Sequence, residues 1–443
     1  MKQSILFILS FCLAHLTFAQ AAGENKEAFS LDEALSFAKN NSYNIRIGEL
    51  NSDRAHQEVI NTQAMGLPQI QASGSFQQFL DIPIQLVPGE FFGAPAGELV
   101  EVQFGTEFLS SYGLSANQLI FDGRYIYGLK ASKAYANYIQ VENDKIGRDV
   151  EDQVLMSYYS ALAAQKNLEI LKESNKNIDK SLSETKAFFA EGFVEELDVD
   201  QLKLMQSTIE SSLKDAENRV QSSLSGLKLS MGYPVDKEIE LTDELEAVLN
   251  INQAQGLLSE TVNTEKHLDM KLVNQGIELQ NIGLRVEQSN YAPTLRAFFS
   301  HQQNNFGNEL DFSTWFPNTV WGVNLNVPLF TSFGTRSKVQ MNKIDIDKME
   351  IQKKQLDQSI RLQASNSRSD FYNSLSQYNN EKKNLELAEK IRNKTSIKFK
   401  EGMASSLELT QAETQLIQTQ GRYIGAMYNL LSAKIKLEQA LGQ

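Results

Sequence analysis

Short segments in both halves of the chain alternate between apolar and polar residues. Residues 69–77 read Gln, Ile, Gln, Ala, Ser, Gly, Ser, Phe, Gln, and residues 111–117 follow the same rule. In the second half, residues 294–300 and 321–327 alternate as well, although Phe298 interrupts the polar row. A period of two is typical of β-strands that have one polar and one apolar face. It predicts strands at about 69–79, 109–121, 294–306 and 319–330.

Long tracts without proline surround these strands, and they predict long helices. Ser30, with Glu33 three residues later, has the spacing of a capping box and is expected to open a helix toward Met65. Pro68 would end it. The tract Arg124–Ala190 contains no proline and could form one helix about 100 Å long at 1.5 Å per residue. Such a helix is too long for a compact domain.

The end of the chain carries a seven-residue repeat typical of a coiled coil. Its large row is Leu409, Leu416, Tyr423, Leu430 and Leu437, and its small row is Ala412, Thr419, Ala426, Ala433 and Ala440. In the first half, Leu168, Leu182 and Phe189 follow the same spacing, with Leu171 and Ile178 beside them. These rows predict antiparallel helices that pack closely along their length.

The sequence is internally duplicated. Gly113–Phe121 reappears as Gly322–Phe330 at an offset of 209, Phe189–Gly192 as Phe399–Gly402 at 210, and Leu67–Ile70 as Ala292–Leu295 at 225. The first copy therefore holds about 16 extra residues between its two strands. We divide the chain into 1–19, a signal peptide; 20–232, a first repeat; 233–257, a linker; and 258–443, a second repeat.

Gly192 and Gly402 interrupt the long helices at equivalent points. Each follows an acidic residue and precedes a renewed helical pattern, as a C-cap glycine in a helical hairpin does. We therefore expect hairpin tips near 192 and 402.

The N-terminus has the pattern of an export signal. Lys2 precedes an apolar run, Ile5–Leu16, and Thr17–Ala19 offers a small-residue cleavage site. The single cysteine, Cys12, lies inside that run, so the mature chain would lack cysteine. An uncleaved anchor is the alternative. No later stretch reaches 18 apolar residues, so any membrane passage would use strands.

Composition and motifs give little support for catalysis. The formal net charge of −13 disfavours nucleic acid as a partner. His56, His267 and His301 are scattered without a metal-ligand spacing, and no phosphate-binding glycine loop or nucleophile elbow occurs. We expect neither enzymatic activity nor a cofactor or bound metal.

Strands with two unlike faces have two explanations. An antiparallel sheet over a soluble core gives this alternation, and so does a transmembrane barrel with a wet lumen. Four matched strands behind an export signal favour the barrel. Four strands cannot close one, however, and open edges are not tolerated in lipid, so the chain must oligomerise.

With these features the sequence resembles the TolC-type outer-membrane efflux proteins (outer membrane factors) over about Phe29–Gln443. The resemblance rests on the order and spacing of the strand starts, strand ends and hairpins. Its marks are Pro68 and Pro293, Gln118–Gly123 and Val327–Phe330, and the Phe-x-x-Gly tips followed by Leu197–Asp198 and Leu407–Glu408.

The resemblance implies a mainly α fold with a small β part. Long antiparallel coiled-coil helices would form a periplasmic α-barrel, and four strands per chain would contribute to a trimeric 12-stranded outer-membrane β-barrel. A periplasmic adaptor (membrane fusion) protein, linked to an inner-membrane pump, would dock at the hairpin tips through Gly192, Phe193, Gly402 and Met403.

The resemblance also implies a polar lumen and a lipid-facing apolar surface. The candidate pore-lining residues are Gln71, Ser73, Ser115, Asn117, Asn324 and Asn326. The first outer loop, about Leu80–Phe108, is long enough to restrict the mouth. Phe312, Trp315 and Phe316 near the second loop could belong to an aromatic belt or could pack that loop.

In the family, acidic rings after the second hairpin close the periplasmic end. Glu408 occupies the first ring position and Gln411 the second, where an acid is frequent. The alternative for Glu408 is a first-turn glutamate that favours the helix dipole. A basic residue two positions after the glycine often holds the closed state, but this chain has Ala404 there.

The predicted function is the outer-membrane channel of a tripartite efflux or type I secretion system in a Gram-negative bacterium. It would passively conduct substrates from the periplasmic pump and adaptor to the exterior. The main alternative is a periplasmic coiled-coil adaptor or scaffold without a membrane barrel, and a passive porin is a second one.

Overall fold

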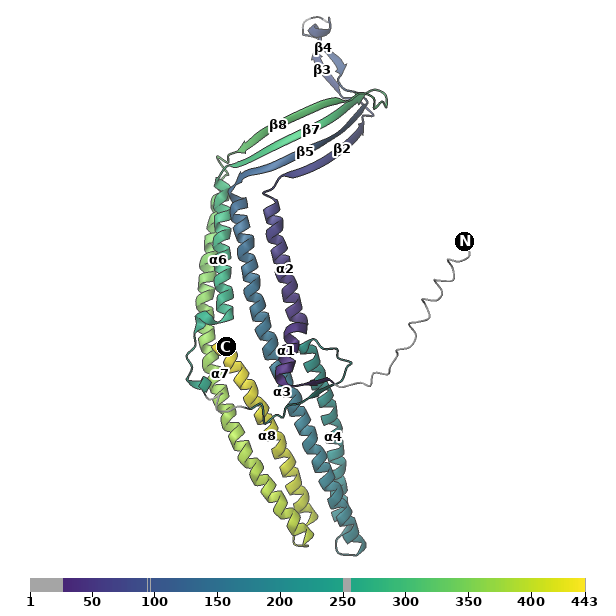
Figure 1. Cartoon of the computed structure of the whole chain (residues 1–443), viewed down its shortest axis with the longest axis vertical. Helices are drawn as coiled ribbons and strands as arrows, with labels where there is room; N and C mark the ends of the chain where they lie inside the picture. Colours follow the sequence, from purple (N-terminus) through teal and green to yellow (C-terminus); the bar gives the residue numbers. More distant parts are fainter. Residues whose placement is uncertain (1–26, 94, 96, 250–255, 443) are drawn as a thin grey trace, which may run out of the picture. The chain divides into compact units, whose positions relative to one another are not determined.

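The computed structural model describes residues 27–93, 95, 97–249 and 256–442. The expected signal peptide, residues 1–19, lies outside this part. The first half contains β1 (Glu27–Phe29), α1 (Leu31–Asn41), α2 (Tyr43–Ala64), β2 (Gln69–Gln78), β3 (Ile84–Pro88), η1 (Gly89–Phe92), β4 (Leu99–Gln103), β5 (Phe108–Asp122), α3 (Gly123–Ala190), α4 (Glu196–Met231) and β6 (Ile239–Leu241). The second half contains η2 (Leu257–Ser259), η3 (Thr264–Lys266), α6 (Leu268–Gln288), η4 (Ser289–Tyr291), β7 (Thr294–Gly307), β8 (Phe316–Asn326), α7 (Gly334–Lys400) and α8 (Ser406–Leu441) (Figure 1).

The fold is mainly helical with a small β part, as the sequence predicts. It divides into two compact units, and each unit draws on both sequence repeats. One contains the described residues of Met1–Glu49, Asn143–Leu268 and Asp357–Gln443, and the other contains Leu50–Glu142 and Asp269–Leu356. We describe each unit by itself.

The second unit is built around one antiparallel sheet. Its strand order is β2-β5-β7-β8, so β2 and β8 are the edge strands (Figure 1). The extra residues of the first repeat form a separate hairpin, in which β3 pairs with β4. The expected strand 319–330 is instead Phe316–Asn326. Pro328 has no N–H for a ladder, which fits the early end of this strand.

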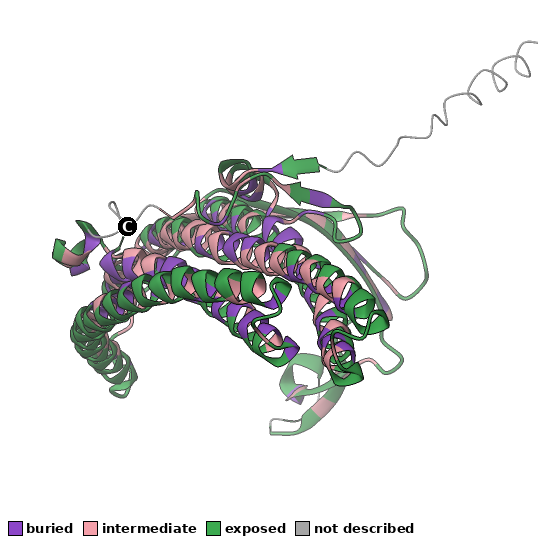
Figure 2. Ribbon diagram, turned by 90° about the horizontal axis from the view of Figure 1, so that it is seen from below, coloured by how far each residue is buried: buried purple, intermediate pink, exposed green. Residues whose placement is uncertain are grey.

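In the helical unit, the seven-residue rows of α8 are buried, except for the partly buried Tyr423. A second set of apolar residues joins α3 to α4: Ile178, Leu182, Val199, Leu202, Met205 and Ile209. Figure 2 shows buried and exposed positions following one another along the helices, as expected for amphipathic packing. Phe189, which continues the first-half row, is exposed because α3 ends one residue later.

The described part of the segment expected to be a linker packs against the helices. Its strand β6 pairs in parallel with β1. The carboxylate of Asp243 accepts hydrogen bonds from the Leu31 N–H at 2.7 Å and from the fully buried Tyr158 hydroxyl at 2.9 Å. The start of α1, the middle of α3 and the linker are thereby held together.

The expected helix from Ser30 toward Met65 is divided in two. Ser30 and Glu33 form the predicted capping box, but Ser42 is extended, with φ −56° and ψ 131°, between α1 and α2. Gly232 lies against this break: a Cβ there would be 2.2 Å from the Asn41 carbonyl oxygen. The position has φ +77°, so space and backbone conformation both require glycine.

Asp152 on α3 is a buried carboxyl group without a hydrogen bond. It is 7% exposed, and its nearest cation is Arg148, with Nε 3.8 Å from Oδ1. Burial, reinforced by the charges of Asp149, Glu151 and Glu438, raises the pKa of Asp152 from 3.8 to about 6, although Arg148 opposes the shift.

Asp152→Asn should therefore stabilise the fold at neutral pH. Because the folded carboxyl binds its proton more tightly than the unfolded one, its ionisation lowers stability progressively as pH rises from about 4 to about 6. The gain should be about 1–3 kcal/mol at pH 7.5 and should vanish near pH 4. Thermal unfolding followed by circular dichroism would measure it. Asp144→Asn, at an exposed position of α3 whose charge is not among those that raise the pKa of Asp152, should show no such pH-dependent gain, and equal behaviour of both variants would contradict the assignment.

Candidate functional site

The register of the sheet gathers polar side chains on one face. Gln71 pairs with Ser115, and Gln69 pairs with Asn117. Across the next strands, Arg296 pairs with Asn324 and Thr294 with Asn326. Paired residues share a face. Because β7 links β5 to β8, the six candidate pore-lining residues all lie on this face, which we call the polar face: Gln71, Ser73, Ser115, Asn117, Asn324 and Asn326.

The opposite face is apolar over the half of the sheet nearest the helices. Ile70 is 72% exposed, Trp321 77% and Leu325 61%, and Leu114 and Val323 lie among them. A single soluble chain rarely exposes so continuous an apolar surface. This apolar face therefore requires a cover of lipid or protein.

The aromatic residues of the second loop divide between the two faces. The Trp315 ring contacts the Tyr112 ring with centroids 4.7 Å apart, and its indole N–H donates to the Phe312 carbonyl at 2.8 Å. Tyr112 belongs to the apolar face, so this cluster packs the loop onto that face. Phe316 instead lies on the polar face, where it contacts Phe306.

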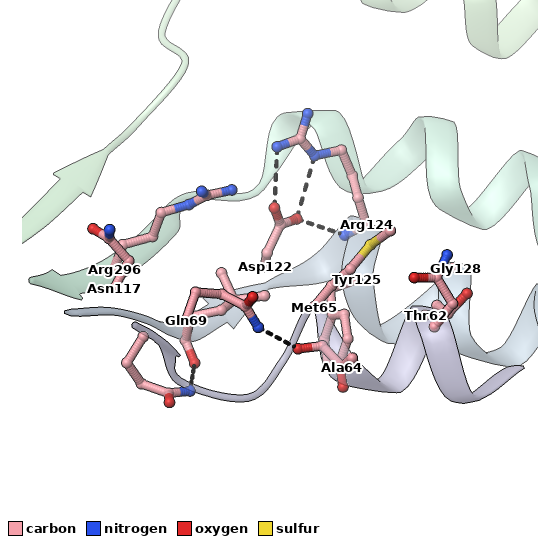
Figure 3. Close-up of a pocket in the computed structure, with 13 residues that line it drawn as sticks. Thr62, Ala64, Met65, Gln69, Asn117, Asp122, Arg124, Tyr125, Gly128 and Arg296 are labelled. Carbon is pink, nitrogen blue, oxygen red and sulfur yellow. Dashed lines mark hydrogen bonds and ion pairs between the residues drawn. The ribbon is translucent and has the colours of Figure 1, made fainter. Parts of the chain in front are cut away.

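A pocket of about 630 Å³ lies where α2, β2, β5 and α3 meet (Figure 3). Arg124 forms a two-pronged ion pair with Asp122, with Nη2 3.0 Å from Oδ2 and Nε 3.3 Å from Oδ1. The amide of Gln118 donates to the Gly66 carbonyl at 2.8 Å. Arg296 and Asn117 line the same pocket from the polar face.

The two hairpin tips have the same backbone geometry. Gly192 has φ +77° and Gly402 has φ +72°. The Phe193 N–H donates to the Phe188 carbonyl at 2.9 Å, and the Met403 N–H donates to the Lys398 carbonyl at 2.8 Å. These are Schellman C-caps, for which the left-handed glycine is the usual residue.

The helix after each tip opens with a capping box. In the second repeat the Ser405 N–H donates to Glu408 Oε2 at 3.0 Å, and the Glu408 N–H donates to the Ser405 hydroxyl at 3.3 Å. In the first repeat, the Glu195 N–H donates to Asp198 Oδ2 at 3.1 Å. Glu408 is therefore a helix-capping residue as well as a gate candidate. Gln411 lies one turn further on and is exposed.

Ser406 joins the two tips, a contact that the sequence reasoning did not anticipate. It is 1% exposed, and its hydroxyl is hydrogen-bonded to Asp198 and lies 2.9 Å from Gln201 Oε1. Two sequence features bear on this contact. Ser406 is the first helical residue of α8, and Asp198 is the repeat equivalent of Glu408. Sequence alone gave no reason to pair equivalent turns with each other.

The tips border a groove of about 950 Å³ with an apolar and acidic lining. Phe193 and Met403 line this groove and are highly exposed. Gly402 also lines it, and Gly192 directly precedes Phe193. Its ionisable lining residues are Glu195, Asp198, Lys400, Glu401 and Glu408. Exposed aromatic and Met side chains in a groove are the features of a protein-docking surface.

The described residues contain no cluster of His, Cys, Asp or Glu that could hold a metal ion. In the same part of the chain, no helix combines the length and the apolar character that crossing a bilayer demands.

Comparisons with known proteins find one matching family and several similar structures. Residues 264–443 match the family described as "Outer membrane efflux protein". The second repeat thus belongs to the outer membrane efflux proteins. The match confirms the resemblance inferred from the strand and hairpin motifs. No curated protein sequence matches the chain.

Solved structures of outer-membrane channels share the fold of this chain. The CmeC channel of Campylobacter jejuni has 15% identity and a TM-score of 0.73, covering 93% of this chain and 85% of its own. VceC of Vibrio cholerae has 15% identity and a TM-score of 0.69, covering 93% and 96%. The open MtrE channel of Neisseria gonorrhoeae has 15% identity and a TM-score of 0.71, covering 93% and 88%. This family and fold are those of channel proteins.

Gly402→Ala should destabilise the second tip by about 1 kcal/mol, because an alanine is strained at positive φ. A Cβ there would meet nothing within 4 Å, so the cost is conformational only. Gly421→Ala is the matched control. It lies within α8, also in open space, and should stabilise by about 0.5–1 kcal/mol. Thermal unfolding would compare them, and effects of the same sign would contradict this account.

Proposed function

We propose that the chain is the outer-membrane channel of a tripartite efflux or type I secretion system. It would conduct substrates passively from a periplasmic pump and adaptor to the exterior. The observation that carries the proposal is the sheet with a polar face, an exposed apolar face and two edge strands whose outer sides pair with no described strand, in a chain whose residues 264–443 match the outer membrane efflux proteins.

The edges supply the argument for a homotrimer. Among the strands of the described residues, β2 pairs only with β5, and β8 only with β7. In lipid each unsatisfied backbone group costs several kcal/mol, so the edges must pair with those of other copies. Three copies of four strands would close a 12-stranded barrel, as the family resemblance implies.

In that barrel the polar face lines the lumen and the apolar face meets lipid. Lumen-lining roles then fall to Gln71, Ser73, Ser115, Asn117, Asn324 and Asn326. An amide- and hydroxyl-lined lumen fits a passive duct, which requires water inside and lipid outside. The proposed function involves no enzymatic activity and no cofactor. The energy for transport would come from the partner pump.

The tips supply the argument for partners. Phe193 and Met403 expose apolar surface in a groove that also presents Glu195, Glu401 and Glu408. A periplasmic adaptor that docks here, through Gly192, Phe193, Gly402 and Met403, would connect the channel to an inner-membrane pump. The helical part would then lie in the periplasm of a Gram-negative cell.

For the gate we propose Glu408, with Gln411 one turn above it. Around a threefold axis, three Glu408 carboxylates would attract cations. The role of the missing basic residue at Ala404 would pass in part to Ser406, which joins the tips within one chain through Asp198.

Fractionation and electrophoresis test the channel against the adaptor or scaffold alternative. The channel should be extracted from the outer membrane as an SDS-resistant trimer whose migration changes on heating. It should also form conducting pores in planar bilayers. Recovery as a soluble periplasmic protein would refute the barrel. Unchanged sensitivity to dyes, detergents and antibiotics after gene deletion would count against efflux.

Glu408→Gln should weaken block of the pore by divalent cations about tenfold, since it removes three converging charges. Single-channel recording with increasing magnesium concentration would measure this. Glu401→Gln is the matched control, because it removes an acid from the same groove before α8 begins. Equal block in wild type and Glu408→Gln would leave Glu408 with its capping role alone.

A further inference from the structure

The polar face of the sheet is almost free of charge. Of the strand residues that the register places on it, only Asp122 and Arg296 are charged. Most of the others carry amides or hydroxyls, among them Gln69, Asn117 and Asn324. A charge set among neutral dipoles dominates the local potential.

The charge of Asp122 is balanced by Arg124. Its side chain is 7% exposed, and both carboxylate oxygens are taken up by Arg124: Oδ1 accepts from the backbone N–H at 2.9 Å and from Nε at 3.3 Å, and Oδ2 accepts from Nη2 at 3.0 Å. In Figure 3 the dashed lines from Asp122 run to Arg124, and none involves Arg296. Arg296 therefore remains as the unbalanced charge of the face.

Arg296 has no polar partner among the residues that the structure describes: no hydrogen bond or ion pair involves its guanidinium. It is exposed on β7, one of the two inner strands, between Leu119 of β5 and Asn324 of β8. Its N–H donors are therefore available to bind a ligand.

An aromatic residue lies on the same face of β7 as Arg296. Phe298, two residues along the same strand and on the same face, pairs with Gly322. A Cβ at position 322 would lie 2.9 Å from Cζ of Phe298, so the ring rests over the glycine. The pocket at the helix-proximal end, with Met65 and Leu119 in its lining, adds further apolar surface.

We propose that Arg296 and Phe298 form a transit site for organic anions that carry a carboxylate or sulfonate on an apolar body. The guanidinium would bind the anionic group in the two-pronged geometry that suits it. The ring and the pocket would contact the apolar body. The inference rests on the proposed channel function, because that function places the polar face in the lumen, where three copies of the site form a ring.

Ion selectivity tests the ring directly. In planar bilayers with a potassium chloride gradient, Arg296→Gln should lower the chloride-to-potassium permeability ratio about twofold, since it removes three screened charges. Arg296→Lys should retain the wild-type ratio. Asn324→Arg, which adds a cation directly across from Arg296, should raise it. A ratio unchanged by both Arg296→Gln and Asn324→Arg would overturn the site.

Block by 2-naphthalenesulfonate tests the ligand class. Its inhibitory concentration should rise roughly tenfold in Arg296→Gln, in line with loss of a charge-assisted contact. It should rise less in Phe298→Ala, which keeps the charge. Equal block in wild type and Arg296→Gln would refute binding at this place.

A cysteine variant allows the charge at position 296 to be changed after the protein has folded. The only native cysteine is Cys12, so Arg296→Cys would carry the sole thiol of the mature chain. A cationic thiol reagent should restore the wild-type ratio, and an anionic reagent should invert the preference. If wild-type trimers gave no conductance at all, the channel function itself would fail; conducting trimers indifferent to these changes would sink only the anion site.

Discussion

β2 and β8 are the edge strands of the four-stranded sheet, and no further strand of the described residues pairs with their outward backbone groups. The proposed assembly follows from that constraint. Water can satisfy such groups, but a bilayer cannot. The same sheet exposes Trp321 and Leu325, which water disfavours. One copy is therefore suited to neither solvent. The proposed edge pairing between copies would resolve both problems, because it would satisfy the backbone and leave only side chains facing lipid.

The duplicated sequence does not give duplicated junctions. In the first repeat β5 ends at Asp122 and α3 begins at Gly123, so the strand passes directly into the helix. In the second repeat Pro328 follows the strand, and Ser332 and Phe333 adopt positive φ before α7. Positive φ at two non-glycine residues is a strained backbone conformation. The strand-to-helix connection is therefore strained in the second repeat and direct in the first.

Periodic features were predictable from sequence, and contacts between distant segments were not. The period of two located the strands, and the seven-residue rows anticipated the buried side of α8, because periodicity reports which side of an element is covered. The break at Ser42 has no local breaker; it matches the close approach of Gly232, 190 residues away. Asp243 and Ser406 were missed for the same reason: their partners are set by tertiary packing.

The two explanations of Glu408 are compatible. One carboxylate oxygen, Oε2, accepts the Ser405 N–H, which fixes the side chain at the start of α8. The equivalent Asp198 uses one oxygen for the Glu195 N–H and the other for Ser406 within the same chain. Among the described residues Glu408 Oε1 has no such partner. The repeats thus share one cap, but only the second leaves a fixed oxygen for a group outside the chain, as a ring around an axis requires.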